Sequence, residues 1–184
     1  MEKVQALEKA AQDILNGKME SAREVIKTEY PFKKLTSTGR NYTDKQKMAQ
    51  FRRDGFLDRY SGQKLLNPGL LKVLSYYIPD EFPYHAHWKM EERHNAYWEF
   101  VPTVDHIYPV ALGGADSEEN WATTSMLHNS IKNNWTLEQL QWQLYDAGNF
   151  EEWDGLTGLF VELVDANFAL LEDAYIKKWY KLSK

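Results

Sequence analysis

Residues 104–134 decide the fold of this chain, and they read Val-Asp-His-Ile-Tyr-Pro-Val-Ala-Leu-Gly-Gly-Ala-Asp-Ser-Glu-Glu-Asn-Trp-Ala-Thr-Thr-Ser-Met-Leu-His-Asn-Ser-Ile-Lys-Asn-Asn. Asp105 and His106 close an apolar run, Asn120 follows an acidic loop, and Asn129 comes nine residues later. Pro109 and the Gly113-Gly114 pair lie between His106 and Asn120, and they favour a strand that ends and a loop that turns. Polar side chains at these intervals can converge on one metal ion and one phosphate group.

This order of residues resembles the HNH endonucleases, also called the ββα-metal or His-Me finger family. The family pattern is roughly Asp-His-Ile-x-Pro, Gly-Gly, Glu-Asn, then His or Asn ahead of x-x-Lys, and it covers about thirty of the 184 residues. Each fragment alone would be read as structural, so the resemblance depends on their occurring together in this order. It implies an α+β fold class, with a small ββα-metal core embedded in a mostly helical single domain.

The resemblance also implies a role for each motif residue. Asp105 would be a metal ligand, His106 the general base, Asn120 the brace of the loop and Asn129 the second metal ligand. The family often has His at the last position, and His128 stands one residue earlier. The spacing to a following lysine favours Asn129, but both registers remain open.

The chemistry of phosphodiester hydrolysis calls for these residue types. Water must be deprotonated near neutral pH, where histidine titrates. The charge that builds on the phosphate is neutralised by a hard cation such as Mg²⁺ or Mn²⁺, held by an oxygen ligand. Neighbouring side chains on a strand point to opposite faces, so Asp105 and His106 need a bend, a bulge or a bridging phosphate to act together.

The chain contains no cysteine, which excludes disulfides and thiolate zinc sites. Many HNH proteins carry a flanking Cys-x-x-Cys zinc ribbon, and residues 58–62 of this chain stand where such a ribbon would begin. We expect packing around four aromatic residues to replace the zinc: Tyr60, Trp88, Tyr97 and Trp98.

The net charge of −5 is unevenly distributed along the chain. Residues 33–64 hold nine Lys and Arg against three Asp, so that segment is +6 and the remainder is −11. A basic segment can contact phosphates while the rest stays negative. We therefore expect Arg52 and Arg53, together with Lys132 of the motif, to contact double-stranded DNA. The alternative is that the basic segment is a solvated linker and helix.

The chain is expected to have four parts: an N-terminal helix (1–32), a basic and aromatic segment (33–100), the HNH motif (101–134) and C-terminal helices (135–184). Periodicity and end signals predict helices over 2–28, 44–53, 70–77 and 156–182. Thr136 with Gln139 forms a capping-box pattern. His85, His87 and His94 could bind a structural metal, contact phosphate or simply pack.

Together these features predict a metal-dependent HNH endonuclease that cuts DNA, with restriction, phage-related or defence roles all suitable. The chain has no apolar run of eighteen residues and its first residues do not resemble a signal peptide, so we expect a soluble, cytoplasmic protein. A single ββα site cuts one strand, so cutting both strands would imply a homodimer or two sequential events. Two alternatives stay open: a non-catalytic nucleic-acid-binding protein that keeps the ββα unit as a scaffold, and an interaction module that uses the acidic C-terminal helix.

Overall fold

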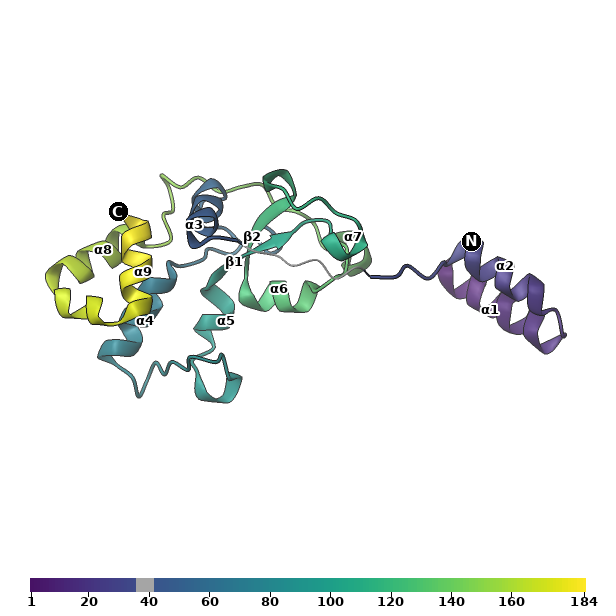
Figure 1. Cartoon of the computed structure of the whole chain (residues 1–184), viewed down its shortest axis with the longest axis horizontal. Coiled ribbons are helices and arrows are strands. Elements are labelled where there is room, and N and C mark those ends of the chain that lie inside the picture. The colour runs from purple at the N-terminus through teal and green to yellow at the C-terminus, as the bar shows by residue number, and fades with distance from the viewer. Residues whose placement is uncertain (36–41) are drawn as a thin grey trace. The chain divides into compact units, whose positions relative to one another are not determined.

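The computed structural model describes residues 1–35 and 42–184 of the chain (Figure 1). The chain divides into two compact units, Met1–Ser37 and Thr38–Lys184. Among the described helices, none is long and apolar enough to cross a membrane.

The first unit is a hairpin of two helices, α1 (Lys3–Leu15) and α2 (Met19–Glu29). The single helix expected over residues 2–28 is therefore wrong. Gly17 adopts φ +71° between the two helices, a left-handed conformation that glycine tolerates and that interrupts the helix. The Lys18 amide then donates to the Asp13 carbonyl across the turn. The apolar periodicity continues on both sides of this turn, which is why the sequence reads as one helix.

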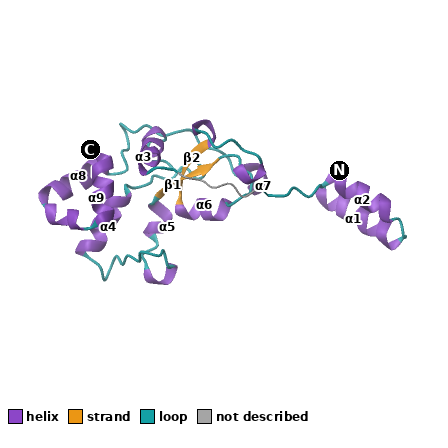
Figure 2. Ribbon diagram, in the orientation of Figure 1, coloured by secondary structure: helices purple, strands orange, loops and turns teal. Residues whose placement is uncertain are grey.

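The second unit is built around two antiparallel strands, β1 (Pro102–His106) and β2 (Trp121–Ser125), with helix α6 (Met126–Lys132) directly after them (Figure 2). The pairing is regular along all five residues of each strand. Ser125 caps α6 by accepting a hydrogen bond from the amide of His128. With this small sheet among many helices, the unit is of a mixed α+β, mostly helical class, as expected.

The other α-helices of this unit are α3 (Asp44–Arg53), α4 (Pro68–Tyr77), α5 (Ala96–Phe100), α7 (Leu137–Leu140), α8 (Thr157–Ala166) and α9 (Ala174–Ser183). The predictions of α3 and of the capping box at Thr136 are confirmed. Helix α4 begins two residues earlier than expected, because Asn67 caps it and Pro68 fits its first turn.

The long helix expected over residues 156–182 is wrong, because a 3-10 turn (Phe168–Glu172) separates α8 from α9. The side chains of Asn167 and Asp173 each accept amide hydrogen bonds that start a new helical segment. Helices α4, α8 and α9 pack together in Figure 1.

One core connects the sheet to these helices. Val104 of β1 and Trp121 of β2 are buried in the same cluster as Phe51, Phe160 and Trp179. Burial of such side chains stabilises the fold by about 1.5–3 kcal/mol each, so the sheet is held in place by helices from both ends of the unit.

The four aromatic residues expected to replace a zinc ribbon do not form one cluster. The rings of Trp88, Tyr97 and Trp98 gather around the guanidinium of Arg93, whose Cζ lies 3.7 Å from the centre of the Trp88 ring. The hydroxyl of Tyr60 instead contacts Asp105 of β1. Part of the expected packing exists, but Tyr60 belongs to the candidate site.

Candidate functional site

The carboxylate of Asp105 lies inside the protein, at the end of β1, and is only 3% exposed. Its Oδ2 accepts a hydrogen bond from the Tyr60 hydroxyl at 2.8 Å and forms an ion pair with Lys132 Nζ at 2.8 Å. Burial raises the pKa of Tyr60 far above its ordinary value, so the phenol keeps its proton and remains a donor. Two groups of its own chain therefore already contact Oδ2 of Asp105.

Lys132 does not present its charge to the surface. Its side chain is completely buried, and Nζ also donates to the backbone carbonyl of His106 at 2.7 Å. The expectation that Lys132 contacts nucleic acid does not fit this position. A buried ammonium requires a partner of opposite charge, and Asp105 supplies it.

His106 faces the opposite side of β1 and is 1% exposed. Its Nε2 lies 2.8 Å from Oδ1 of Asp116, and the hydroxyl of Tyr42 lies 3.0 Å from Nδ1 and 3.2 Å from Nε2. Trp121 Nε1 also donates to Asp116 Oδ1, at 3.2 Å. Because the Asp116 side chain is 45% exposed, this pair connects the buried imidazole to the surface.

The structure does not bring Asp105 and His106 to one point. Asp105 pairs with Ala122 and His106 with Trp121 in an unbroken register, so β1 contains neither a bulge nor a skipped residue here. Their side chains therefore leave the strand on opposite faces. Asp105 and His106 were expected to need a bend, a bulge or a bridging phosphate in order to act together. Because the pairing of β1 is regular, a substrate group that bridges the two side chains is the way left to join them.

Asn120 makes the contacts expected of a loop brace. Its Nδ2 donates to the carbonyls of Tyr108 (2.9 Å) and Ala115 (2.7 Å), and its Oδ1 accepts from the Tyr108 amide (2.9 Å). Gly114 lies inside this loop, where a Cβ atom would come within 2.2 Å of the Tyr108 carbonyl oxygen. The glycine and the asparagine together close the loop that carries Asp116.

Asn129 and His128, the two candidates for the second metal ligand, both lie on α6 but differ in their surroundings. Asn129 is half-buried, and among the described residues its side chain makes no hydrogen bond. His128 is already held, because its Nδ1 lies 2.7 Å from Oδ2 of Asp58 and 3.0 Å from the Ser125 hydroxyl. Asn129 is thus the side chain with an uncommitted oxygen, and His128 is anchored to the fold.

Asp58 is fully buried. It stands where a zinc ribbon would begin in many HNH proteins. Besides His128, it accepts hydrogen bonds from the Thr124 hydroxyl (3.1 Å) and from the amides of Ser125 (2.8 Å) and Tyr60 (2.9 Å). One carboxylate therefore connects the segment around Tyr60 to β2 and α6.

The two arginines expected at a nucleic-acid surface both hold backbone carbonyls. Arg52 donates to Leu182 and Ser183 at the end of α9, at 3.1 and 3.2 Å. Arg53 donates to Glu118 and Trp121, at 2.9 and 3.0 Å, and its side chain is 43% exposed. Arg53 thus lies beside the loop of the candidate site and reaches solvent, whereas Arg52 caps a helix.

The remaining histidines are used in local contacts. The ring of His94 stacks on Phe82 at 4.2 Å, and its Nδ1 accepts from the Ala96 amide. His85 lies 3.4 Å from Glu92. Within residues 1–35 and 42–184, no three His, Cys, Asp or Glu side chains gather as a metal cluster.

The donor types at Asp105 and Asn129 nevertheless fit a magnesium ion, which takes one or two protein oxygens and keeps several waters. Asn129 stands one helical turn before Lys132, whose Nζ contacts Asp105. A metal at Asp105 would therefore compete with Lys132 for the same carboxylate.

Sequence reasoning missed Asp116 and Asp58, the two carboxylates that engage His106 and His128. Asp116 stands directly after the Gly-Gly-Ala turn, so its place in the motif loop was the available signal. In comparisons with known proteins, no family model, no curated protein and no solved structure matches this chain.

Proposed function

We propose that this chain is a metal-dependent HNH endonuclease that hydrolyses phosphodiester bonds in double-stranded DNA. The observation that carries the proposal is the placement of the motif: the Asp-His pair ends β1, Asn120 braces the connecting loop, and Asn129 lies on the helix that follows β2. Residues chosen only for packing would not require a histidine–carboxylate pair at the end of the strand.

His106 is the proposed general base, and Asp116 orients it. A carboxylate only accepts hydrogen bonds, so the proton in the pair with Asp116 stands on Nε2 of the imidazole. Nδ1 is then the basic nitrogen, and the Tyr42 hydroxyl lies 3.0 Å from it, against 3.2 Å from Nε2. A water in place of that hydroxyl would give its proton to Nδ1, while Asp116 faces the positive charge that the ring gains.

Asp105 and Asn129 are the proposed ligands of Mg²⁺ or Mn²⁺. When bound, the cation would stabilise the charge on the phosphate and on the departing oxygen. A cation on Oδ2 of Asp105 would displace the ion pair with Lys132.

The exposed guanidinium of Arg53, next to the loop that carries Asp116, is the proposed contact to the DNA backbone. Such contacts position the substrate without reading its sequence. Expression in the cytoplasm, close to DNA, would suit this activity.

The test incubates supercoiled plasmid with the purified full-length chain and Mg²⁺, with EDTA as the control. The proposal predicts nicked or linear plasmid only with the metal. Equal cleavage in EDTA would contradict the metal requirement, and no cleavage with Mg²⁺ or Mn²⁺ would contradict the nuclease.

A second candidate is a nucleic-acid-binding protein that keeps the ββα unit without catalysis. The burial of His106 and the ion pair between Asp105 and Lys132 favour it, since both groups are already occupied. The same experiment separates the two, because this candidate would retard DNA in a gel without cutting it.

A further inference from the structure

Arg93 carries a buried positive charge that no acidic side chain among the described residues neutralises. The residue is only 4% exposed, and arginine stays protonated in proteins. Among the described residues, its guanidinium makes one hydrogen bond, from Nη2 to the Trp88 carbonyl. At 3.5 Å, this contact is longer than the usual N–H···O distance. A buried charge normally has a partner of opposite charge, and Arg93 lacks one.

Three buried hydrogen-bond donors of this region have no acceptor. Within residues 1–35 and 42–184, Nε and Nη1 of Arg93 and Nε1 of Trp98 are buried without a hydrogen-bond partner. Cζ of Arg93 lies 5.1 Å from the centre of the Trp98 ring, so the three atoms belong to one cluster. All three can only donate, and buried donors in proteins are nearly always paired. The cluster therefore calls for an acceptor that the described chain does not supply.

The aromatic rings around Arg93 stabilise its charge but do not pair its N–H groups. Cζ lies 3.7 Å from the centre of the Trp88 ring and 5.5 Å from that of Tyr97. A ring attracts a cation over its face, whereas the N–H groups of a guanidinium are matched by oxygen acceptors. The Tyr97 hydroxyl is already held by the Leu71 carbonyl (3.0 Å) and the Ser75 hydroxyl (2.7 Å). The rings thus hold the cation in place and leave its donors unpaired.

The carboxylate that precedes Arg93 in the sequence is used elsewhere. Glu92 accepts a hydrogen bond from Lys89 at 2.8 Å through Oε1. Its other carboxylate oxygen lies 3.4 Å from Nε2 of His85. The adjacent acid thus connects the two ends of segment 85–92 and does not pair with Arg93.

Trp88 covers the guanidinium and stands in a strained turn. Its side chain is half-buried, so the cluster lies close beneath the surface. The backbone of Trp88 has φ +58°, in the left-handed region that residues other than glycine rarely adopt. The turn is closed by a hydrogen bond from the Trp88 amide to the His85 carbonyl, at 3.1 Å. Strain of this kind gathers at ligand clamps, and its relief would move Trp88 and open Arg93 to an ion from solvent.

The unpartnered donors match a terminal phosphate group. Arginine forms short, charge-assisted pairs with phosphate and carboxylate groups. A terminal phosphate has three strong acceptor oxygens, one for each unpartnered donor, whereas a carboxylate has two oxygens. We propose that Arg93 and Nε1 of Trp98 form a binding site for a terminal phosphate, with Trp88 as its cover. The phosphate is either a free ion or the 5′ end of a nucleic acid. The site is independent of the proposed nuclease.

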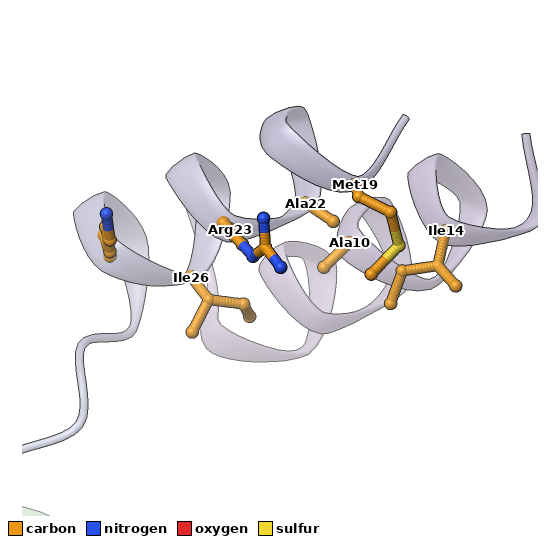
Figure 3. Close-up of a pocket in the computed structure, with 7 residues that line it drawn as sticks. Ala10, Ile14, Met19, Ala22, Arg23 and Ile26 are labelled. Atoms are coloured by element: carbon orange, nitrogen blue, oxygen red, sulfur yellow. The ribbon is translucent and has the colours of Figure 1, made fainter. Parts of the chain in front are cut away.

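Arg23 on α2 offers a matched control for the charge of Arg93. Figure 3 shows Arg23 among the side chains of both hairpin helices that line a groove. Its side chain is 59% exposed and pairs with Glu20. Arg23→Met removes the same charge as Arg93→Met, but from a solvated side chain that already has a partner. It should bind phosphate like wild type.

Calorimetry with inorganic phosphate tests the site on the full-length chain, in EDTA and at constant ionic strength. We expect saturable binding at a single site in wild type. Arg93→Met should lower the affinity at least about a hundredfold, because it removes at least two charge-assisted hydrogen bonds. Trp98→Phe keeps an aromatic ring and removes only the N–H donor, so it should lower the affinity about tenfold. Phosphate should raise the melting temperature of wild type more than that of either variant.

A duplex oligonucleotide with or without a 5′-phosphate distinguishes the two sources. Displacement of inorganic phosphate by the phosphorylated duplex alone assigns the site to nucleic-acid ends. If neither duplex displaces it, the site takes the free ion. Displacement by both duplexes alike would contradict a site for terminal phosphate.

Wild type that binds phosphate no better than chloride overturns the proposal. Wild-type phosphate affinity in folded Arg93→Met also overturns it, with folding measured by circular dichroism. If Arg93→Met does not fold, Trp98→Phe decides, and unchanged affinity in that variant rejects the site.

Discussion

Asp105 and Lys132 form a completely internal ion pair, with 2.8 Å between Oδ2 and Nζ, at the junction of β1 and α6. The residue proposed to bind a metal is thus already neutralised by a cation of the same chain.

Replacing Lys132 with Met should destabilise the protein by about 3–5 kcal/mol, because the carboxylate of Asp105 is left buried without a partner. Urea denaturation measures this change. Lys89→Met is the matched control, because its ion pair with Glu92 lies at the surface and contributes about 0–1 kcal/mol. If Asp105 can take a metal, Mg²⁺ should raise the melting temperature of Lys132→Met more than that of wild type. Equal stability of Lys132→Met and wild type would contradict the buried pair.

Metal binding distinguishes Asn129 from His128 as the second metal ligand on α6. Asn129→Ala should abolish the binding of Mg²⁺ or Mn²⁺ in calorimetry and leave stability nearly unchanged, because its side chain makes no hydrogen bond with the described residues. His128→Ala should retain the metal but lose stability by about 1–3 kcal/mol, because it leaves the buried carboxylate of Asp58 with one partner fewer. The opposite ranking would assign the ligand to His128.

Arg52 and Arg53 were both expected to contact DNA, but the structure gives the two side chains different surroundings. Arg53→Ala should lower the slope of log affinity for DNA against log salt by about 0.9, the value for one phosphate contact. Arg52→Ala should leave that slope unchanged and reduce stability instead, because its guanidinium holds the last carbonyls of α9. Filter binding over a range of salt concentrations, together with thermal melts, measures both effects. A reduced slope in Arg52→Ala alone would reverse the assignment.

A pH measurement tests the contact that joins the two helices of the hairpin. The hydrogen bond from Ser21 is the main cause that lowers the pKa of Asp13 below its ordinary value, and Lys9 contributes. A lowered pKa means that the carboxylate stabilises the hairpin above the ordinary Asp pKa, and that this contribution is lost as pH falls through the folded-state pKa. NMR titration should show the Asp13 pKa rising toward its ordinary value in Ser21→Ala but not in Ser21→Thr. An unchanged pKa in Ser21→Ala would contradict the contact.

The sequence was sufficient where the signals are local. The Pro and Gly-Gly pattern anticipates the turn between β1 and β2, and the loop-bracing contacts of Asn120 follow from its position in the motif. The capping box at Thr136 marks the start of α7 in the same way. Each of these features depends on residues close together in the chain.

The sequence was insufficient where a contact joins distant segments. A lysine at the end of a helix is ordinarily solvated, and only the folded chain shows that Lys132 reaches Asp105, 27 residues earlier. Asp58 and His128 are 70 residues apart, so no spacing rule connects them. The regular pairing of β1, which sends Asp105 and His106 to opposite faces, is likewise a property of the sheet as a whole.

Single-turnover cleavage of plasmid by His106→Ala measures whether His106 serves as the general base of a nuclease. Loss of a general base typically lowers the rate by about 10² to 10⁴. We expect a loss of this size in His106→Ala with DNA binding retained, and wild-type cleavage by His87→Ala, which removes an exposed histidine. Cleavage by a folded His106→Ala at the wild-type rate would contradict it.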